Sequence, residues 1–127
     1  INNLLNWMKK NQADYTNTFC YLMNISSIKN EIYKDKNFID WFKNWENRVL
    51  TNSGSKENSL KLMKKNNPIV IPRNHKVEEA LEAANNNDLK PMYDLLSILK
   101  KPYTKQINIE KFQAPSNNKN YQTFCGT

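Results

Sequence analysis

The chain has 127 residues, of which 39% are hydrophobic and 24% charged, and its formal net charge at pH 7 is +7. This length and composition are ordinary for one soluble globular domain, and no apolar run approaches the roughly 20 residues of a transmembrane helix. Its two cysteines are too few for a secreted disulfide scaffold, so a reducing cytoplasm is the expected compartment.

Apolar residues recur at helical spacing through the first half of the chain. The low glycine content, two residues in all, also favours helices joined by polar turns. We expect a first helix around Leu4 and Met8, and a second helix that Asp14 caps. A short helix should follow around Ile28 and Ile32. The broad apolar surface of the second helix predicts that it packs on two sides.

The strongest periodic segment carries aromatic side chains and is expected to begin at a cap formed by Asn37. The residues of its stripe are Phe38, Trp41, Phe42, Trp45 and Val49. Aromatic side chains bury large areas, so we expect this helix to anchor the core, and a ligand groove is the less favoured alternative. Residues 51–54 then break the chain, and Ser55 is expected to cap a helix that carries Leu60 and Met63.

Residues 67–103 are the segment around which we interpret the rest of the chain. Pro68 and Pro72 predict an extended connector, because proline fixes its own φ and disfavours helix at the residue before it. Asn74 and Asp88 are expected to cap the two helices of a hairpin that follows. The apolar positions are Val77, Ala80, Leu81 and Ala84 in the first helix, and Leu89, Met92, Leu95, Leu96 and Leu99 in the second.

Polar residues of the connector could bind a ligand, but a structural role is favoured for each. His75 is the only histidine, which excludes a multi-histidine metal site, and we expect it to make a structural hydrogen bond. Arg73 and Asn74 could bind a phosphate or a carboxylate. We favour the alternative that Arg73 ties the connector to a neighbouring carbonyl.

The lysine-rich segment 56–76 raises the question of nucleic-acid binding. It contains no aromatic side chains to stack on bases and no glycine loop. We therefore expect a solvated lysine face, with an electrostatic contact to RNA or an acidic partner as the alternative.

Several strings along the chain carry a resemblance to one family. They are Asp14-Tyr15-Thr16-Asn17-Thr18-Phe19, Asn67-Pro68, Ile71-Pro72-Arg73-Asn74-His75, Val77-Glu78, Ala80-Leu81, Lys101-Pro102-Tyr103 and Phe124-Cys125-Gly126-Thr127. In order and spacing they resemble the C-terminal region of the selenoprotein O (YdiU) family, protein adenylyltransferases with a protein-kinase-like fold. The connector residues Asn67, Pro68, Pro72, Arg73, Asn74 and His75 form its main structural motif.

The resemblance implies that the chain is the last part of a longer, cytoplasmic bacterial enzyme, and the missing initial Met fits an excised fragment. The full-length protein would move AMP from ATP to protein hydroxyls with a divalent metal such as Mg²⁺. Its nucleotide pocket, metal ligands and catalytic Asp would lie upstream, so no catalytic, cofactor-binding or metal residue is expected here. The implied partners are the upstream kinase-like domain and protein substrates; neither membrane nor nucleic acid is expected.

The two cysteines have different expected roles. Family members end in Cys or selenocysteine followed by two small residues, which Cys125-Gly126-Thr127 matches. In bacterial relatives this cysteine is linked to redox control through pairing with a cysteine of the kinase-like part, which makes Cys125 a redox candidate. Cys20 stands where many relatives carry a basic residue, and it is expected to be a core residue.

Together these observations predict an all-α fold, an irregular bundle of about five to seven helices. The helical domain should span residues 1–103, and an irregular, extended tail should span residues 104–127 and end in Cys125. The fragment is expected to be structural and redox-regulatory, and not itself catalytic. The alternative function is a free-standing basic helical adaptor that binds RNA or an acidic protein.

Overall fold

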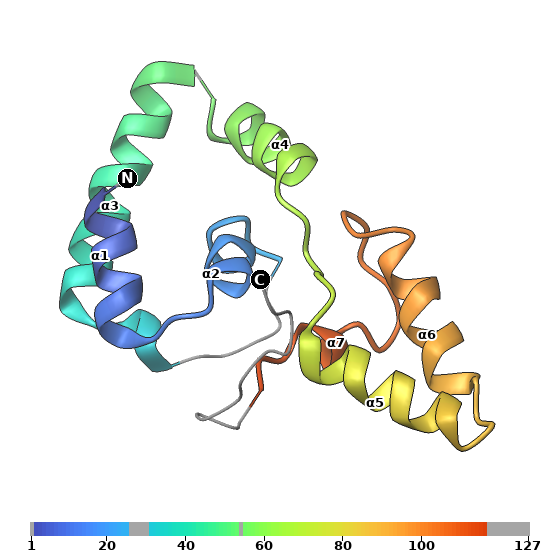
Figure 1. The fold of residues 1–127 in the computed structure, drawn as a ribbon. Coiled ribbons are helices and arrows are strands. Elements are labelled where there is room, and N and C mark those ends of the chain that lie inside the picture. The colour runs from blue at the N-terminus through green and yellow to red at the C-terminus, as the bar shows by residue number, and fades with distance from the viewer. Residues whose placement is uncertain (1, 26–30, 54, 117–127) are drawn as a thin grey trace. The chain divides into compact units, whose positions relative to one another are not determined.

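The computed structural model describes residues 2–25, 31–53 and 55–116. All regular secondary structure in these ranges is helical, which confirms the all-α prediction (Figure 1). The chain divides into two compact units, Ile1–Pro68 and Ile69–Thr127, and each unit is described by itself. No helix in the described ranges is long and apolar enough to cross a membrane.

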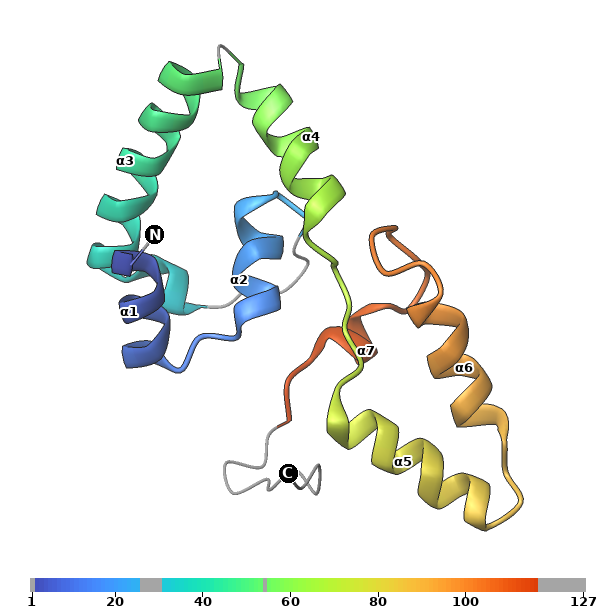
Figure 2. The same cartoon turned by 45° about the horizontal axis from the view of Figure 1, so that its top comes forward.

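Unit 1 is organised around one long helix. Its elements are α1 (Asn2–Asn11), α2 (Tyr15–Leu22), the 3-10 helix η1 (Glu31–Lys34), α3 (Lys36–Ser53) and α4 (Lys56–Asn66). The long helix α3 contacts α1, η1 and α4. Figure 2 shows α4 turning back from the end of α3, so that the two helices form an open hairpin.

Aromatic side chains fill the core of unit 1. Phe38 is 1% exposed, and its ring centroid lies 4.6 Å from that of Trp7 and 5.1 Å from that of Tyr33. The buried cluster consists of Leu4, Trp7, Met8, Leu22, Tyr33 and Phe38. The expectation that the α3 stripe anchors a core is therefore confirmed at Phe38.

Two of the three predicted caps in unit 1 are confirmed. Asp14 accepts a hydrogen bond from the Asn17 amide at 2.8 Å, and Ser55 caps α4. The prediction for α3 was wrong, because that helix already includes Asn37. Its first turn is capped by Asp35, whose Oδ1 accepts from the amide of Phe38 at 3.2 Å.

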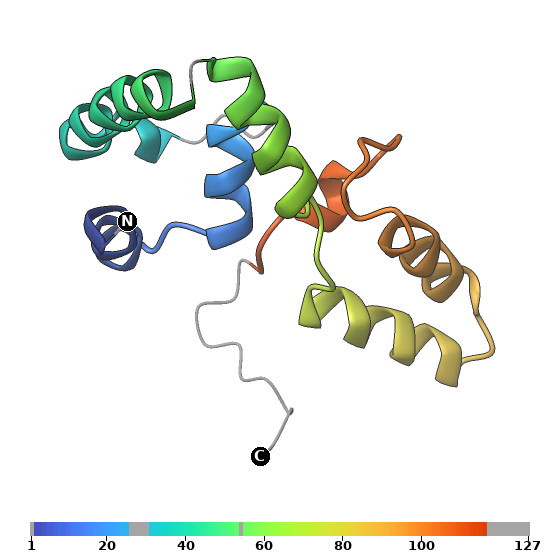
Figure 3. The same cartoon turned by 90° about the horizontal axis from the view of Figure 1, so that it is seen from above.

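Unit 2 is a helical hairpin with an extended lead-in, as predicted. Its helices are α5 (Asn74–Asn85), α6 (Lys90–Leu99) and the single turn α7 (Glu110–Gln113). Helices α5 and α6 lie side by side in Figures 2 and 3 and share extensive contacts. In the lead-in, Ile69 and Val70 are buried, and the Ile69 amide donates to the Pro102 carbonyl at 2.8 Å.

The predicted caps of unit 2 differ from the observed ones by one residue. Asn74 is the first residue of α5, and Arg73 occupies the cap position without a side-chain capping bond. Leu89 occupies the cap position of α6, while Asp88 accepts from the Lys90 amide at 3.0 Å. The turn α7 was missed, since four residues are too few to show a helical period.

Three leucines expected on the apolar faces of the hairpin are exposed. They are Leu81 in α5, Leu89 next to α6, and Leu96 within α6. In α6, the buried side consists of Leu95 and Ile98. The apolar arc of this helix is therefore wider than the surface that its neighbours cover.

Asparagine takes the left-handed backbone positions of the turns. Asn24, Asn87 and Asn108 have φ values of 55°, 62° and 59°, and Gln12 has a φ of 51°. Asparagine tolerates this region better than most residues with a Cβ. Asn87 thus ends the turn after α5 with a left-handed residue.

Candidate functional site

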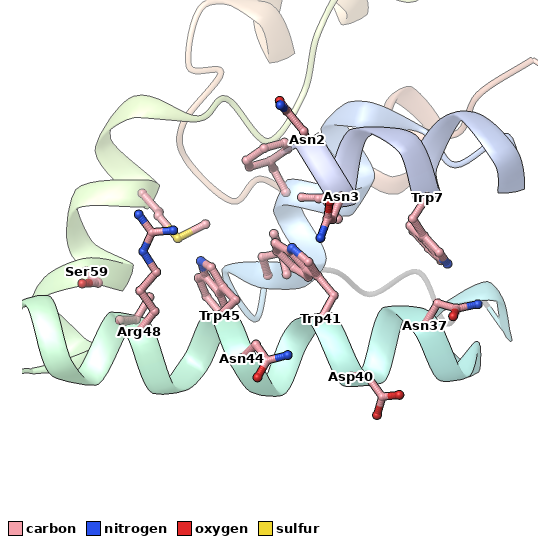
Figure 4. Close-up of a pocket in the computed structure, with 15 residues that line it drawn as sticks. Asn2, Asn3, Trp7, Asn37, Asp40, Trp41, Asn44, Trp45, Arg48 and Ser59 are labelled. Atoms are coloured by element: carbon pink, nitrogen blue, oxygen red, sulfur yellow. The ribbon is translucent and has the colours of Figure 1, made fainter.

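An open hollow in unit 1 offers a concave surface for binding. It lies between α1, α2, α3 and α4 and has a volume of about 1090 Å³ (Figure 4). Apolar side chains from these four helices line it, among them Trp41, Trp45 and Met63, together with several asparagines. Arg48 and Asp40 are its two charged residues, so their formal charges cancel.

Two of the three tryptophans that line the hollow have a double role. Trp41 and Trp45 stack with ring centroids 6.2 Å apart and an interplanar angle of 14°. Both are half-buried and pack against the buried aromatic cluster, while also lining the hollow. The α3 stripe is therefore buried in the core at Phe38, whereas Trp41 and Trp45 pack against the core from its edge and line the hollow.

The chemistry of the hollow suits apolar groups better than phosphates. Phosphoryl and nucleotidyl transfer need several cations around the phosphates and a carboxylate-bound metal. The hollow offers one arginine and one carboxylate, whereas its stacked indoles and methionine offer apolar contact area.

The connector is held by a chain of hydrogen bonds to α7 and to the end of the hairpin. Arg73 Nη2 donates to the Gln113 carbonyl at 2.9 Å, and Gln113 Nε2 donates to the Ile69 carbonyl at 2.7 Å. The predicted bond from Arg73 to a neighbouring carbonyl is thus confirmed. Since a charged donor makes a stronger hydrogen bond than a neutral one, Arg73 is a structural anchor of the connector.

Gln113 is a structural partner of the connector that the sequence did not predict. Its buried side chain donates to the carbonyl of Ile69, 44 positions away, and its backbone carbonyl accepts from Arg73, 40 positions away. A glutamine among scattered apolar residues gives no signal of such a role.

The remaining motif residues hold local structure or lie at the surface. The side chain and amide of Asn67 both donate to the Met63 carbonyl at 2.9 Å, which closes the end of α4. Pro68 and His75 are half-buried, whereas Pro72 and Asn74 are exposed. Within the described ranges, no three His, Cys, Asp or Glu side chains are grouped so that they could hold a metal ion.

The structure describes one of the two cysteines. Cys20 lies in α2 and is 1% exposed, which confirms that it is a core residue. The redox candidate Cys125 lies outside the described residues.

The lysine-rich segment is partly neutralised by ion pairs. Lys56 is paired with Glu46, and Lys76 with Glu79 at 2.7 Å. Lys61, Lys64 and Lys65 are exposed on α4. These contacts are those of a solvated charged surface, where individual ion pairs add little stability.

The pKa values of two ionisable groups in unit 1 are shifted by their surroundings. The Trp7 indole donates to Asp35 Oδ1 at 2.7 Å, and this hydrogen bond holds the pKa of Asp35 below its usual value. Burial raises the pKa of Tyr33, whose hydroxyl lies 3.2 Å from Thr18 Oγ1. Both groups belong to the core and its edge, so their role is structural.

Comparison with known proteins identifies the family. Residues 1–100 match the family described as "Protein adenylyltransferase SelO". The chain is 46% identical over 129 residues to "Protein nucleotidyltransferase YdiU" of Pelagibacter ubique, and 46% identical over 131 residues to the protein of that name in Bacillus cereus strain ATCC 14579. A Bacillus anthracis relative of the same name is 45% identical over 131 residues.

These alignments span 100% of this chain but 27% of each relative. No solved structure matches the chain significantly. The match over 100 residues shows that the chain belongs to the protein adenylyltransferase SelO family, which confirms the resemblance seen in the sequence.

Proposed function

We propose that the chain is the C-terminal helical region of a protein adenylyltransferase, which transfers AMP from ATP to protein hydroxyls. The observation that carries this proposal is the 46% sequence identity between the chain, over its whole length, and proteins named as nucleotidyltransferases. The chain spans 27% of the length of each of these proteins. In this proposal the chain provides structure, and the catalytic groups lie in the other part of the polypeptide.

The chemistry of adenylyl transfer supports this division. ATP and Mg²⁺ need a phosphate-binding loop, cations and metal-binding carboxylates, and the sequence contains no glycine-rich phosphate loop. Arg73, the arginine of the main motif, bonds instead to a backbone carbonyl. We assign ATP, Mg²⁺ and the protein substrates to the kinase-like part, in a bacterial cytoplasmic enzyme.

Cys125 is proposed to regulate the full-length enzyme through its redox state. The support is the resemblance of Cys125-Gly126-Thr127 to the family's terminal motif. The Cys125 thiolate would form a disulfide with a cysteine of the kinase-like part, and the two thiols would give two electrons and two protons to a disulfide or peroxide oxidant. Cys20 does not compete in this role, because it is buried.

The rival function, a basic adaptor for RNA or an acidic protein, has less support. Lys56 and Lys76 are already paired with glutamates, and the relatives named above are nucleotidyltransferases.

The test compares the full-length protein with residues 1–127 alone. We expect transfer of labelled AMP from ATP–Mg²⁺ by the full-length protein, and no saturable calorimetric binding of ATP–Mg²⁺ by residues 1–127. Micromolar binding by residues 1–127 would contradict the structural role, and absence of AMP transfer by the full-length protein would contradict the activity.

A second arm tests Cys125. Activity of the full-length enzyme should change on adding reductant, and Cys125→Ser should remove that response while Cys20→Ala retains it. A Cys125→Ser enzyme that still responds to reductant as the unmodified enzyme does would exclude the redox role.

A further inference from the structure

Helix α6 is apolar on two sides, and the hairpin covers one of them. Leu95 and Ile98 are buried against the rest of unit 2. On another side, Leu89, Tyr93 and Leu96 are 46%, 63% and 46% exposed. In Figure 3, α5 lies along one side of α6, and no other helix of the described part of unit 2 lies along the opposite side of α6.

The three exposed residues form one continuous surface. Their spacing of four and three residues places them on one face of the helix, over roughly 10 Å of its length. Single exposed leucines are common on protein surfaces, but a contiguous apolar patch marks an interaction site. We call this patch the α6 stripe.

Polar groups mark the borders of the α6 stripe. On one flank, Lys90 Nζ donates to Asp94 Oδ2 at 2.7 Å, and Ser97 Oγ donates to the Asp94 carbonyl at 2.8 Å. At the C-terminal end, exposed Lys100 lies one turn beyond Leu96, and exposed Lys101 follows it. An occupant of the stripe would therefore present an apolar surface with carboxylates facing the lysine end.

We propose that the α6 stripe is the surface on which the part of the same polypeptide outside residues 1–127 docks. This inference rests on the proposed function, in which the chain belongs to a longer enzyme. The chain spans 27% of its relatives, so their larger part has no counterpart here and is available as the occupant. Covering three large side chains would give the docking its main driving force.

Site-specific photo-crosslinking in the full-length protein tests the inference. Benzoylphenylalanine replaces Tyr93 in one variant and Ser97, on the polar flank of the same helix, in the control. We expect crosslinks from position 93 to residues upstream of this chain, with a yield about tenfold above that from position 97. The crosslinked residues are mapped by mass spectrometry.

A matched pair of substitutions checks the contribution of the stripe. In the Tyr93 crosslinking protein, Leu96→Asp should reduce the upstream crosslink yield about tenfold, because it places a charge in an apolar contact. Ser97→Asp should leave the yield unchanged. Equal yields from positions 93 and 97, or no effect of Leu96→Asp, would overturn the inference.

Other occupants would also be recognised by the crosslinks. Crosslinks between two copies of the protein, to an added protein substrate, or to residues 117–127 in place of upstream residues would each overturn it. AMP transfer is assayed separately, so failed docking with intact transfer contradicts this inference alone. Upstream crosslinks without AMP transfer contradict the proposed activity alone.

Discussion

The two units are stabilised by different means. In unit 1, aromatic rings from α1, α2, η1 and α3 contact one another around Phe38. In unit 2, the buried side chains are mostly aliphatic, among them Ile69, Val70, Leu95 and Ile98. Phe112 is the one aromatic ring buried among the described residues of this unit, and Gln113 links the core to the backbone of the connector.

Because of this difference, we expect the two units to be destabilised by different kinds of substitution. Aromatic side chains bury large areas, so unit 1 is most sensitive to lost volume. A buried hydrogen bond contributes little net stability, but a buried group left without its partner is costly. Unit 2 should therefore be most sensitive to the loss of a polar partner.

The largest expected effect is that of Phe38→Ala on unit 1. Removal of a buried phenylalanine costs roughly 3–5 kcal/mol of the free energy of unfolding. Hydrogen exchange on residues 1–127 should show lost protection in α1 and α3, with protection in α5 and α6 retained. The control is Ile39→Ala, at the exposed neighbour in the same helix. Equal loss of protection in α5 and α6 would mean that the two units unfold together.

A smaller effect, confined to unit 2, is expected for Gln113→Leu. The Ile69 carbonyl then loses the Nε2 donor, and removing one partner of a buried hydrogen bond costs about 1–3 kcal/mol. Hydrogen exchange should accelerate in the connector and α5, while α3 stays unchanged. Ala114→Leu, which adds apolar volume at the exposed next residue, is the control. A Gln113→Leu chain as stable as the unmodified chain would show that polar links do not hold unit 2.

The smallest effect concerns Asp35 and depends on pH. Its folded pKa is lowered from 3.8, chiefly by the Trp7 hydrogen bond, so its charged form stabilises unit 1 at pH values above 3.8. That contribution is lost as the pH falls from 3.8 toward the folded pKa. We expect Asp35→Asn to lower the Tm at pH 7 and to differ less from the unmodified chain at pH 3.

Thermal melts at the two pH values measure this effect, with Asp40→Asn, at an exposed carboxylate within α3, as the control. A Tm difference for Asp35→Asn that grows on acidification would contradict the assigned direction of the pKa shift.

Local patterns predicted the parts of the molecule that local interactions determine. Helical spacing of apolar residues predicted the main helices, and the two prolines predicted the extended lead-in. The buried state of Cys20 followed from its place on an apolar helical face. Cap positions were less accurate, because neighbouring Asp and Asn residues are alternative candidates for them, as Asp35 and Asn37 are at the start of α3.

Features that depend on distant residues could not be predicted in this way. The hydrogen bonds of Gln113 join it to Ile69, 44 positions away, and to Arg73, 40 positions away. A helical period cannot reveal partners at such separations. The exposure of Leu89 and Leu96 is also a tertiary property. Periodicity shows that a helix face is apolar, but not which neighbour covers it. The hollow beside Trp41 and Trp45 likewise depends on where α4 returns to α3.

The asparagines with positive φ have a consequence for the gene. Asn24, Asn87 and Asn108 occupy backbone conformations that glycine commonly supplies, in a chain that contains two glycines. Every glycine codon begins with two guanines, whereas both asparagine codons begin with two adenines. At these turns, the fold therefore places no demand for guanine on the coding sequence. A genome rich in adenine and thymine can encode this backbone without losing its left-handed turns.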